Sequence, residues 1–92
     1  MAKTLRVIIS GRVQGIGYRA WTISAASSMG LKGWVRNRND GSVEAVFSGD
    51  EKNVTAMIDS CKEGPPMARV ERIETFTCNE ELSGPFTARH DA

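Results

Sequence analysis

The chain has 92 residues, of which 40% are hydrophobic and 25% are charged, enough for one compact domain spanning residues 1–92 but not for a second core. Its 12 basic and 11 acidic side chains nearly balance, which excludes the strong positive field that gathers nucleic acids, so any anion site must be local. No apolar run approaches the roughly 20 residues that span a bilayer and no signal peptide is evident, which predicts a soluble cytoplasmic protein without membrane partners.

Turn signals divide the chain into short elements. The β-branched run Leu5–Ile9 predicts a buried first strand, and a loop with several glycines follows it. Over Ala20–Met29, apolar and small residues recur at the spacing of one helix face, and Gly30 provides a stop signal. This segment is the predicted first helix.

A hairpin is predicted in the middle of the chain. The segments Gly33–Asn37 and Ser42–Phe47 flank Asn39-Asp40-Gly41. An Asp-Gly pair readily supplies the positive φ angles that a tight turn requires. The two flanking segments are therefore expected to be antiparallel neighbours.

The second half repeats the pattern of helix and strand. Asp50 is placed to cap a helix whose apolar stripe runs over residues 54–61 and which ends at Gly64-Pro65-Pro66. A fourth strand is predicted at Ala68–Thr77, and Phe86–Arg89 is expected to add a short edge strand. The order β-α-β-β-α-β predicts a ferredoxin-like α+β sandwich, with two helices packed on one face of an antiparallel sheet.

The loop from Gly11 to Arg19 is the main candidate for a binding site. It joins a strand to a helix, where successive main-chain N–H groups and the helix N-terminus can converge on an anion. Gly15 and Gly17 allow the backbone to curl. The glycine spacing alone is equally consistent with an ordinary strand-to-helix turn.

Two nucleotide-binding interpretations fail on context. Residues 15–20 fit the loose dinucleotide pattern, and Asp40 lies about 20 residues further on. That fold needs a parallel second strand, whereas here the second strand leads directly into a hairpin. A Walker loop is excluded because no Lys-Ser/Thr pair follows the glycines.

Two stretches carry a specific resemblance. The segment Ile9–Arg19 resembles the phosphate-loop signature of the acylphosphatase family, with Ile16 and Tyr18 where the family often has valine and phenylalanine. Gly33–Asn37, followed by appropriately spaced glycine and valine residues up to Gly49, is similar to the second signature of that family. The resemblance extends over nearly the whole chain, including the predicted order of elements.

The resemblance implies an enzyme that hydrolyses acyl phosphates to a carboxylate and inorganic phosphate. No cofactor is expected, and nothing in the sequence suggests more than a monomer. By this resemblance, Arg19 and the loop amides are expected to bind the phosphoryl group, and Asn37 is expected to orient the attacking water. The amides concerned are those of Gln14, Gly15, Ile16, Gly17, Tyr18 and Arg19. Phosphate or sulfate is expected to bind there as a product-like ligand. The acyl group is not specified, and both carboxyl phosphates and carbamoyl phosphate fit.

Other reactive side chains are assigned no chemistry. His90, the single histidine, is expected to be exposed near the C-terminus. Cys61 and Cys78 lack the spacing and neighbours of a metal or redox site and are expected to be reduced packing residues, so no metal and no covalent intermediate are predicted. Arg36 and Arg38 flank Asn37 and either attract an anionic substrate or form a solvated pair at the strand end. The two tryptophans are interpreted as packing residues.

Two further functions share the predicted fold. RNA-recognition domains stack bases on aromatic residues of the central strands, but Leu5–Ile9 has none and Ser42–Phe47 has only Phe47. An acylphosphatase-like module of a larger carbamoyl-transfer maturation protein is the other alternative. A single domain is expected here, which argues against this alternative.

Overall fold

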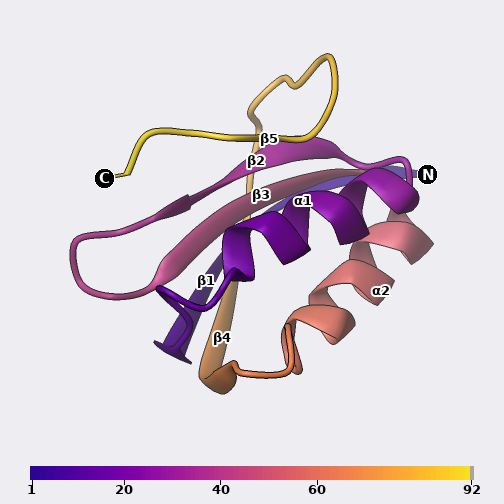
Figure 1. Cartoon of the computed structure of the whole chain (residues 1–92). Coiled ribbons are helices and arrows are strands. Elements are labelled where there is room, and N and C mark those ends of the chain that lie inside the picture. Colours follow the sequence, from indigo (N-terminus) through magenta and orange to yellow (C-terminus); the bar gives the residue numbers. More distant parts are fainter. Residues whose placement is uncertain (92) are drawn as a thin grey trace.

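In the computed structural model, which describes residues 1–91, two helices cover one face of a five-stranded sheet (Figure 1). The elements are β1 (Ala2–Arg12), α1 (Tyr18–Ser28), β2 (Lys32–Asn37), β3 (Val43–Asp50), α2 (Glu51–Cys61), β4 (Arg69–Thr77) and β5 (Thr87–Ala88). Neither helix within the described residues is long and apolar enough to cross a membrane.

The sheet has the strand order β4-β1-β3-β2-β5, and its first four strands are antiparallel neighbours. The predicted ferredoxin-like class and the hairpin between β2 and β3 are confirmed. The expectation of a wholly antiparallel sheet is wrong for β5, which runs parallel to β2. After β4 the chain crosses to the opposite edge and enters beside β2 in the same direction, where only Thr87 and Ala88 pair (Figure 1).

Several element boundaries differ from the sequence prediction, among them those of β1 and α1. β1 extends well beyond Leu5–Ile9, because β3 and β4 pair with it on both sides. α1 begins at Tyr18 rather than Ala20, because Gly17 takes a left-handed conformation, with φ of 83°, that turns the chain directly into the helix. Arg19 consequently lies in the first helical turn.

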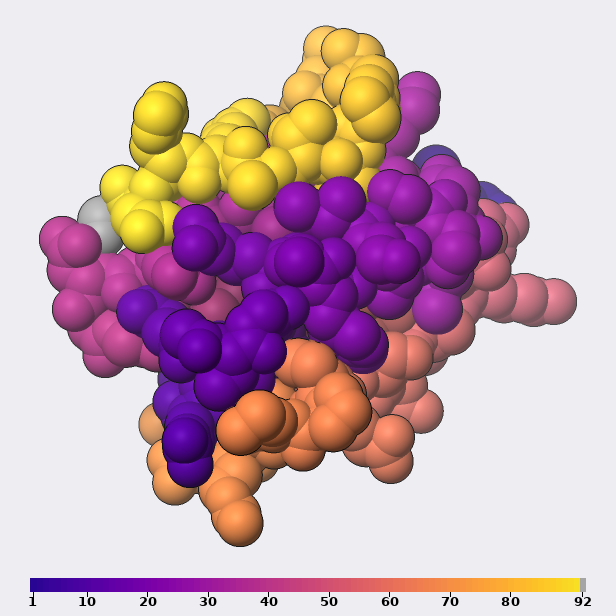
Figure 2. Space-filling model, viewed as in Figure 1, coloured from indigo at the N-terminus to yellow at the C-terminus, as the bar shows by residue number. Residues whose placement is uncertain are grey.

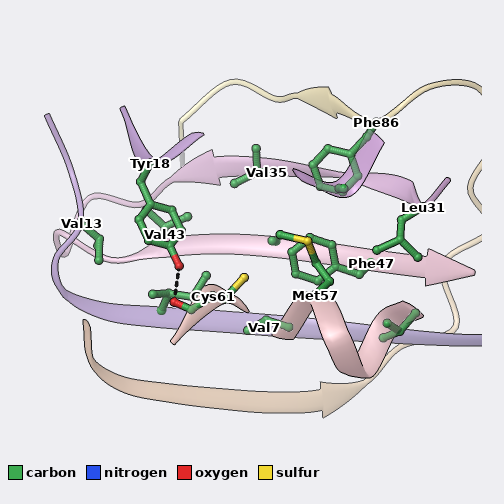
Figure 3. Packing of buried hydrophobic residues seen from close by; sticks show 14 residues of the cluster. Val7, Val13, Tyr18, Leu31, Val35, Val43, Phe47, Met57, Cys61 and Phe86 are labelled. Atoms are coloured by element: carbon green, nitrogen blue, oxygen red, sulfur yellow. Dashed lines mark hydrogen bonds between the residues drawn. The ribbon is translucent and has the colours of Figure 1, made fainter. Parts of the chain in front are cut away.

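The core lies between the helices and the sheet and is filled mainly by alternate residues of the strands together with one stripe from each helix (Figure 3). Its fully buried large side chains include Tyr18, Phe47, Ile9 and Met57. The Tyr18 hydroxyl donates a 2.6 Å hydrogen bond to the main-chain oxygen of Cys61, which ties the start of α1 to the end of α2 (Figure 3).

Both cysteines are free thiols, and Cys61 is buried, as expected from the sequence. Burial raises the pKa of the Cys61 thiol to about 12. Burial likewise raises the pKa of the Tyr18 hydroxyl. Both groups are therefore neutral at physiological pH and serve packing and hydrogen bonding.

The opposite face of the sheet carries a charge network. Glu44 is only 6% exposed and accepts a 2.7 Å hydrogen bond from Arg36 Nε, while Arg6 Nη1 lies 3.3 Å from its other oxygen. Trp34, also buried, donates from Nε1 to Glu80 at 3.0 Å. Trp34 is thus a packing residue, as predicted, and Arg36 is directed to Glu44 on the face away from the helices.

The bond between Tyr18 and Cys61 predicts a measurable stability effect. The Cys61 carbonyl lies in the last turn of α2, where helices leave carbonyl groups without intrahelical donors. Replacing Tyr18 with phenylalanine keeps the ring but removes the donor, so we expect the free energy of unfolding to fall by about 1–2 kcal/mol. Urea denaturation followed by circular dichroism measures this change. An unchanged midpoint would contradict the assignment.

Candidate functional site

The connection between β1 and α1 is a sharp turn that depends on two glycines. Gly15 and Gly17 have φ angles of 76° and 83°, in the left-handed region that other residues rarely adopt. Nothing lies within 4 Å of the position that a Cβ would take at either residue. The requirement for glycine is therefore conformational and does not come from crowding.

This turn leaves a series of main-chain donors free. Within residues 1–91, the N–H groups of residues 14–19 donate no hydrogen bond to the chain itself. α1 also lacks a capping side chain and acidic residues in its first turn. α2 differs, because the carboxylate of Asp50 accepts from Lys52 N at 2.9 Å and Glu51 follows it. The positive end of the α1 dipole thus stays uncompensated, an arrangement that suits an anion.

The side chain of Gln14 fixes this loop to the connection between β2 and β3. Its Nε2 donates to the main-chain oxygens of Arg38 and Ser42, each at 2.8 Å. Sequence analysis assigned only the main-chain amide of Gln14 to the site. No pattern in the sequence signalled the carboxamide contact, because its partners lie 24 and 28 residues away.

One cavity of about 310 Å³ brings together most of the residues predicted to form the site. Asn37 and Arg19 both line it, because the end of β2 and the start of α1 lie at the same end of the fold (Figure 1). Gln14 and Ile16 of the predicted loop are not among the lining residues. The lining consists of Val13, Gly15, Gly17, Tyr18, Arg19, Ala20, Ile23, Asn37 and Ala88.

A residue that sequence analysis missed lies beside Arg19 and Asn37. Oδ1 of Asp91 is 3.3 Å from Arg19 Nη1 and accepts a hydrogen bond from the main-chain N–H of Asn37, also at 3.3 Å. The C-terminal segment reaches this position by lying against the start of α1 (Figure 2). The segment carries no recognisable motif, so nothing in the sequence indicated this contact.

The other candidate cations do not point into the cavity. Arg36 is held by Glu44 on the opposite face, which removes the interpretation in which it attracts an anion beside Asn37. Arg38 lies 3.7 Å from Asp40, whose pKa is lowered chiefly by the hydroxyl of Ser42, which donates to it at 2.6 Å. His90 is exposed, as expected, and lines a separate hollow with Arg36, Ala88 and Arg89.

The donor set of the cavity suits an anion. Main-chain N–H groups, a guanidinium and a carboxamide are all able to donate hydrogen bonds. Its lining contains no histidine, cysteine or carboxylate. Across the part of the chain that the structure describes, no three or more histidine, cysteine or carboxylate side chains are grouped so that they could hold a metal ion.

The fold and the loop define a class: small ferredoxin-like α+β proteins with a glycine turn between the first strand and the first helix whose free N–H groups suit an anion. The Acylphosphatase family model matches residues 5–87 of this chain. The acylphosphatase of Azorhizobium caulinodans is 57% identical over 74 residues, which cover 80% of each chain. An acylphosphatase structure from Coxiella burnetii superposes with a TM-score of 0.91 at 31% identity, covering 96% of this chain and 93% of that one. The chain belongs to the acylphosphatase family.

The same fold also occurs within a much longer protein. The structure of full-length HypF in its phosphate- and nucleotide-bound form matches with a TM-score of 0.89 at 26% identity. The match covers 99% of this chain and 12% of HypF. The domain described here is thus similar to a small portion of that protein.

The Gln14 contacts predict a stability change in the loop. Replacing Gln14 with methionine keeps a side chain of similar length but removes the donor to both carbonyl groups. We expect the free energy of unfolding to fall by about 1–2 kcal/mol, the net value of two such bonds. We also expect lower ¹⁵N order parameters for the amides of residues 14–17 than in the unmodified chain, because the loop loses its anchor. Unchanged order parameters there would show that the carboxamide does not hold the loop.

Proposed function

We propose that this chain hydrolyses acyl phosphates by direct attack of water, with Arg19 and the loop amides holding the phosphoryl group and Asn37 orienting the water. The observation that carries the proposal is the shared cavity, which is lined by Arg19, Asn37 and the two loop glycines. Family membership supports the reaction class.

Binding of the phosphoryl group is the first step. Unpartnered N–H groups at the start of α1 supply preorganised donors, and the helix dipole adds a favourable potential for negative charge. The planar guanidinium of Arg19 can donate two parallel hydrogen bonds to phosphoryl oxygens. Since the loop amides are fixed by the fold before substrate arrives, they stabilise the charge that develops in the transition state at little reorganisation cost.

Hydrolysis itself needs a positioned water molecule. The Asn37 carboxamide can accept a hydrogen bond from water through Oδ1 and donate to an oxygen through Nδ2. The water oxygen attacks phosphorus, the bond between phosphorus and the acyl oxygen breaks, and its electron pair leaves with the carboxylate. Because a carboxylate is a good leaving group, positioning and charge stabilisation suffice without a general acid.

We also infer the product-like ligand, the oligomeric state and the cellular compartment of this protein. We infer that phosphate and sulfate bind the loop as product-like ligands, since both are tetrahedral anions that match its donors. One chain supplies every residue that lines the cavity, in keeping with an active monomer. The two free thiols are consistent with a reducing compartment such as the cytoplasm.

Single substitutions test the two assigned side chains. Arg19→Ala and Asn37→Ala are each expected to lose roughly 3 kcal/mol of transition-state stabilisation, about a 100-fold drop in kcat/KM for benzoyl phosphate. Arg72→Ala and Asn39→Ala are matched controls, because both residues are exposed and neither lines the cavity. A variant at position 19 or 37 that turns over at the unmodified rate would remove that residue from the mechanism.

The pH profile provides a second test. No side chain that lines the cavity titrates near neutrality, since burial raises the pKa of Tyr18 and the remaining polar side chains are a guanidinium and a carboxamide. We therefore expect kcat/KM for benzoyl phosphate to stay nearly constant between about pH 6 and 8 and to survive EDTA. A steep limb near pH 6.5 or inactivation by EDTA would refute the mechanism.

A further inference from the structure

A carboxylate of the chain itself lies among the groups that we assign to the phosphoryl site. Asp91 Oδ1 is 3.3 Å from Arg19 Nη1 and 3.3 Å from the main-chain nitrogen of Asn37. One carboxylate oxygen thus contacts Arg19, which we assign to binding of the phosphoryl group, and Asn37, which we assign to orienting the water.

A carboxylate oxygen and a phosphoryl oxygen are alike in charge and in their ability to accept hydrogen bonds from these donors. While Nη1 donates to Asp91, the positive charge of Arg19 is partly compensated and one of its N–H donors is occupied, so the guanidinium attracts a phosphoryl group less strongly. We propose that Asp91 is an internal competitor for the phosphoryl site, which substrate must displace in order to bind. This inference rests on the role proposed above for Arg19.

The fold delivers the carboxylate by anchoring the residues just before it. β5 pairs with β2, and Arg89 N donates to Val35 O at 2.9 Å. The Arg89 side chain donates to Glu80 at 2.6 Å and lies over the ring of Trp34, with 4.4 Å between its guanidinium carbon and the ring centroid. Because Arg89 is fixed two residues before Asp91, the Asp91 carboxylate stays near Arg19 and has a high effective concentration there.

The contact is nevertheless weak enough to open. The side chains of Arg19 and Asp91 are 44% and 54% exposed, and exposed ion pairs contribute little because water and salt screen them. Displacing the Asp91 carboxylate therefore lowers the affinity of the site for substrate only in part. Competition of this strength corresponds to a change of about two- to five-fold in apparent affinity.

The substitution Asp91→Asn in the full chain tests the proposal, because it removes the charge while keeping the shape. We expect KM for benzoyl phosphate and the competitive inhibition constant of inorganic phosphate both to fall about two- to five-fold, with kcat unchanged. Asp59→Asn is the matched control. It removes the same charge from an exposed carboxylate on α2 that pairs with Lys62 at 3.0 Å, and neither constant should change. Unchanged or raised constants in Asp91→Asn would overturn the proposal.

A second measurement does not depend on turnover. The amide signal of Asn37 in a ¹H–¹⁵N spectrum should move in Asp91→Asn without phosphate, since that N–H loses its carboxylate partner. Titration with inorganic phosphate should then shift the loop amides at a lower concentration than in the unmodified chain. A stationary Asn37 signal, or equal phosphate affinities in the two proteins, would overturn the proposal that Asp91 competes with phosphate. If phosphate binds as expected but benzoyl phosphate is not hydrolysed, the proposed catalysis fails while the competition stands.

Discussion

The left-handed turn at Gly15 and Gly17 is the constraint on which the rest of the site depends. It ends β1, starts α1 at Tyr18 and leaves the intervening N–H groups outside every helix and strand ladder. It also places Arg19 in the first helical turn, where a guanidinium and the positive end of the helix dipole reinforce each other. A side chain at either glycine would be forced into a backbone conformation that costs free energy.

Two contacts hold this turn from opposite sides. The Tyr18 hydroxyl bonds to the end of α2 in the core, and the Gln14 carboxamide bonds to the connection between β2 and β3. The first fixes the helix start and the second fixes the loop relative to the strand end that carries Asn37. The proposed mechanism requires this rigidity, because donors that must reorganise on binding stabilise a transition state less.

The sheet separates two groups of charged side chains, one on each of its faces. On the face away from the helices, Glu44 forms ion pairs with both Arg6 and Arg36, although Arg36 is the immediate neighbour of Asn37 in the sequence. On the helix side, Arg19 is the cationic side chain that lines the cavity, and Asp91 is its carboxylate partner. The electrostatics of the site therefore depend on the C-terminal segment as well as on the loop.

The sequence by itself determined the order of the elements, the hairpin, the glycine turn and the pair Arg19 and Asn37, because local periodicity, turn chemistry and two short signatures specify them. Tertiary structure alone decided the parallel direction of β5, the bonds of the Gln14 carboxamide and the position of Asp91. Asp91 meets Arg19 across 72 residues and Asn37 across 54. Contacts at such separations follow from how the chain crosses the sheet, which no local pattern encodes.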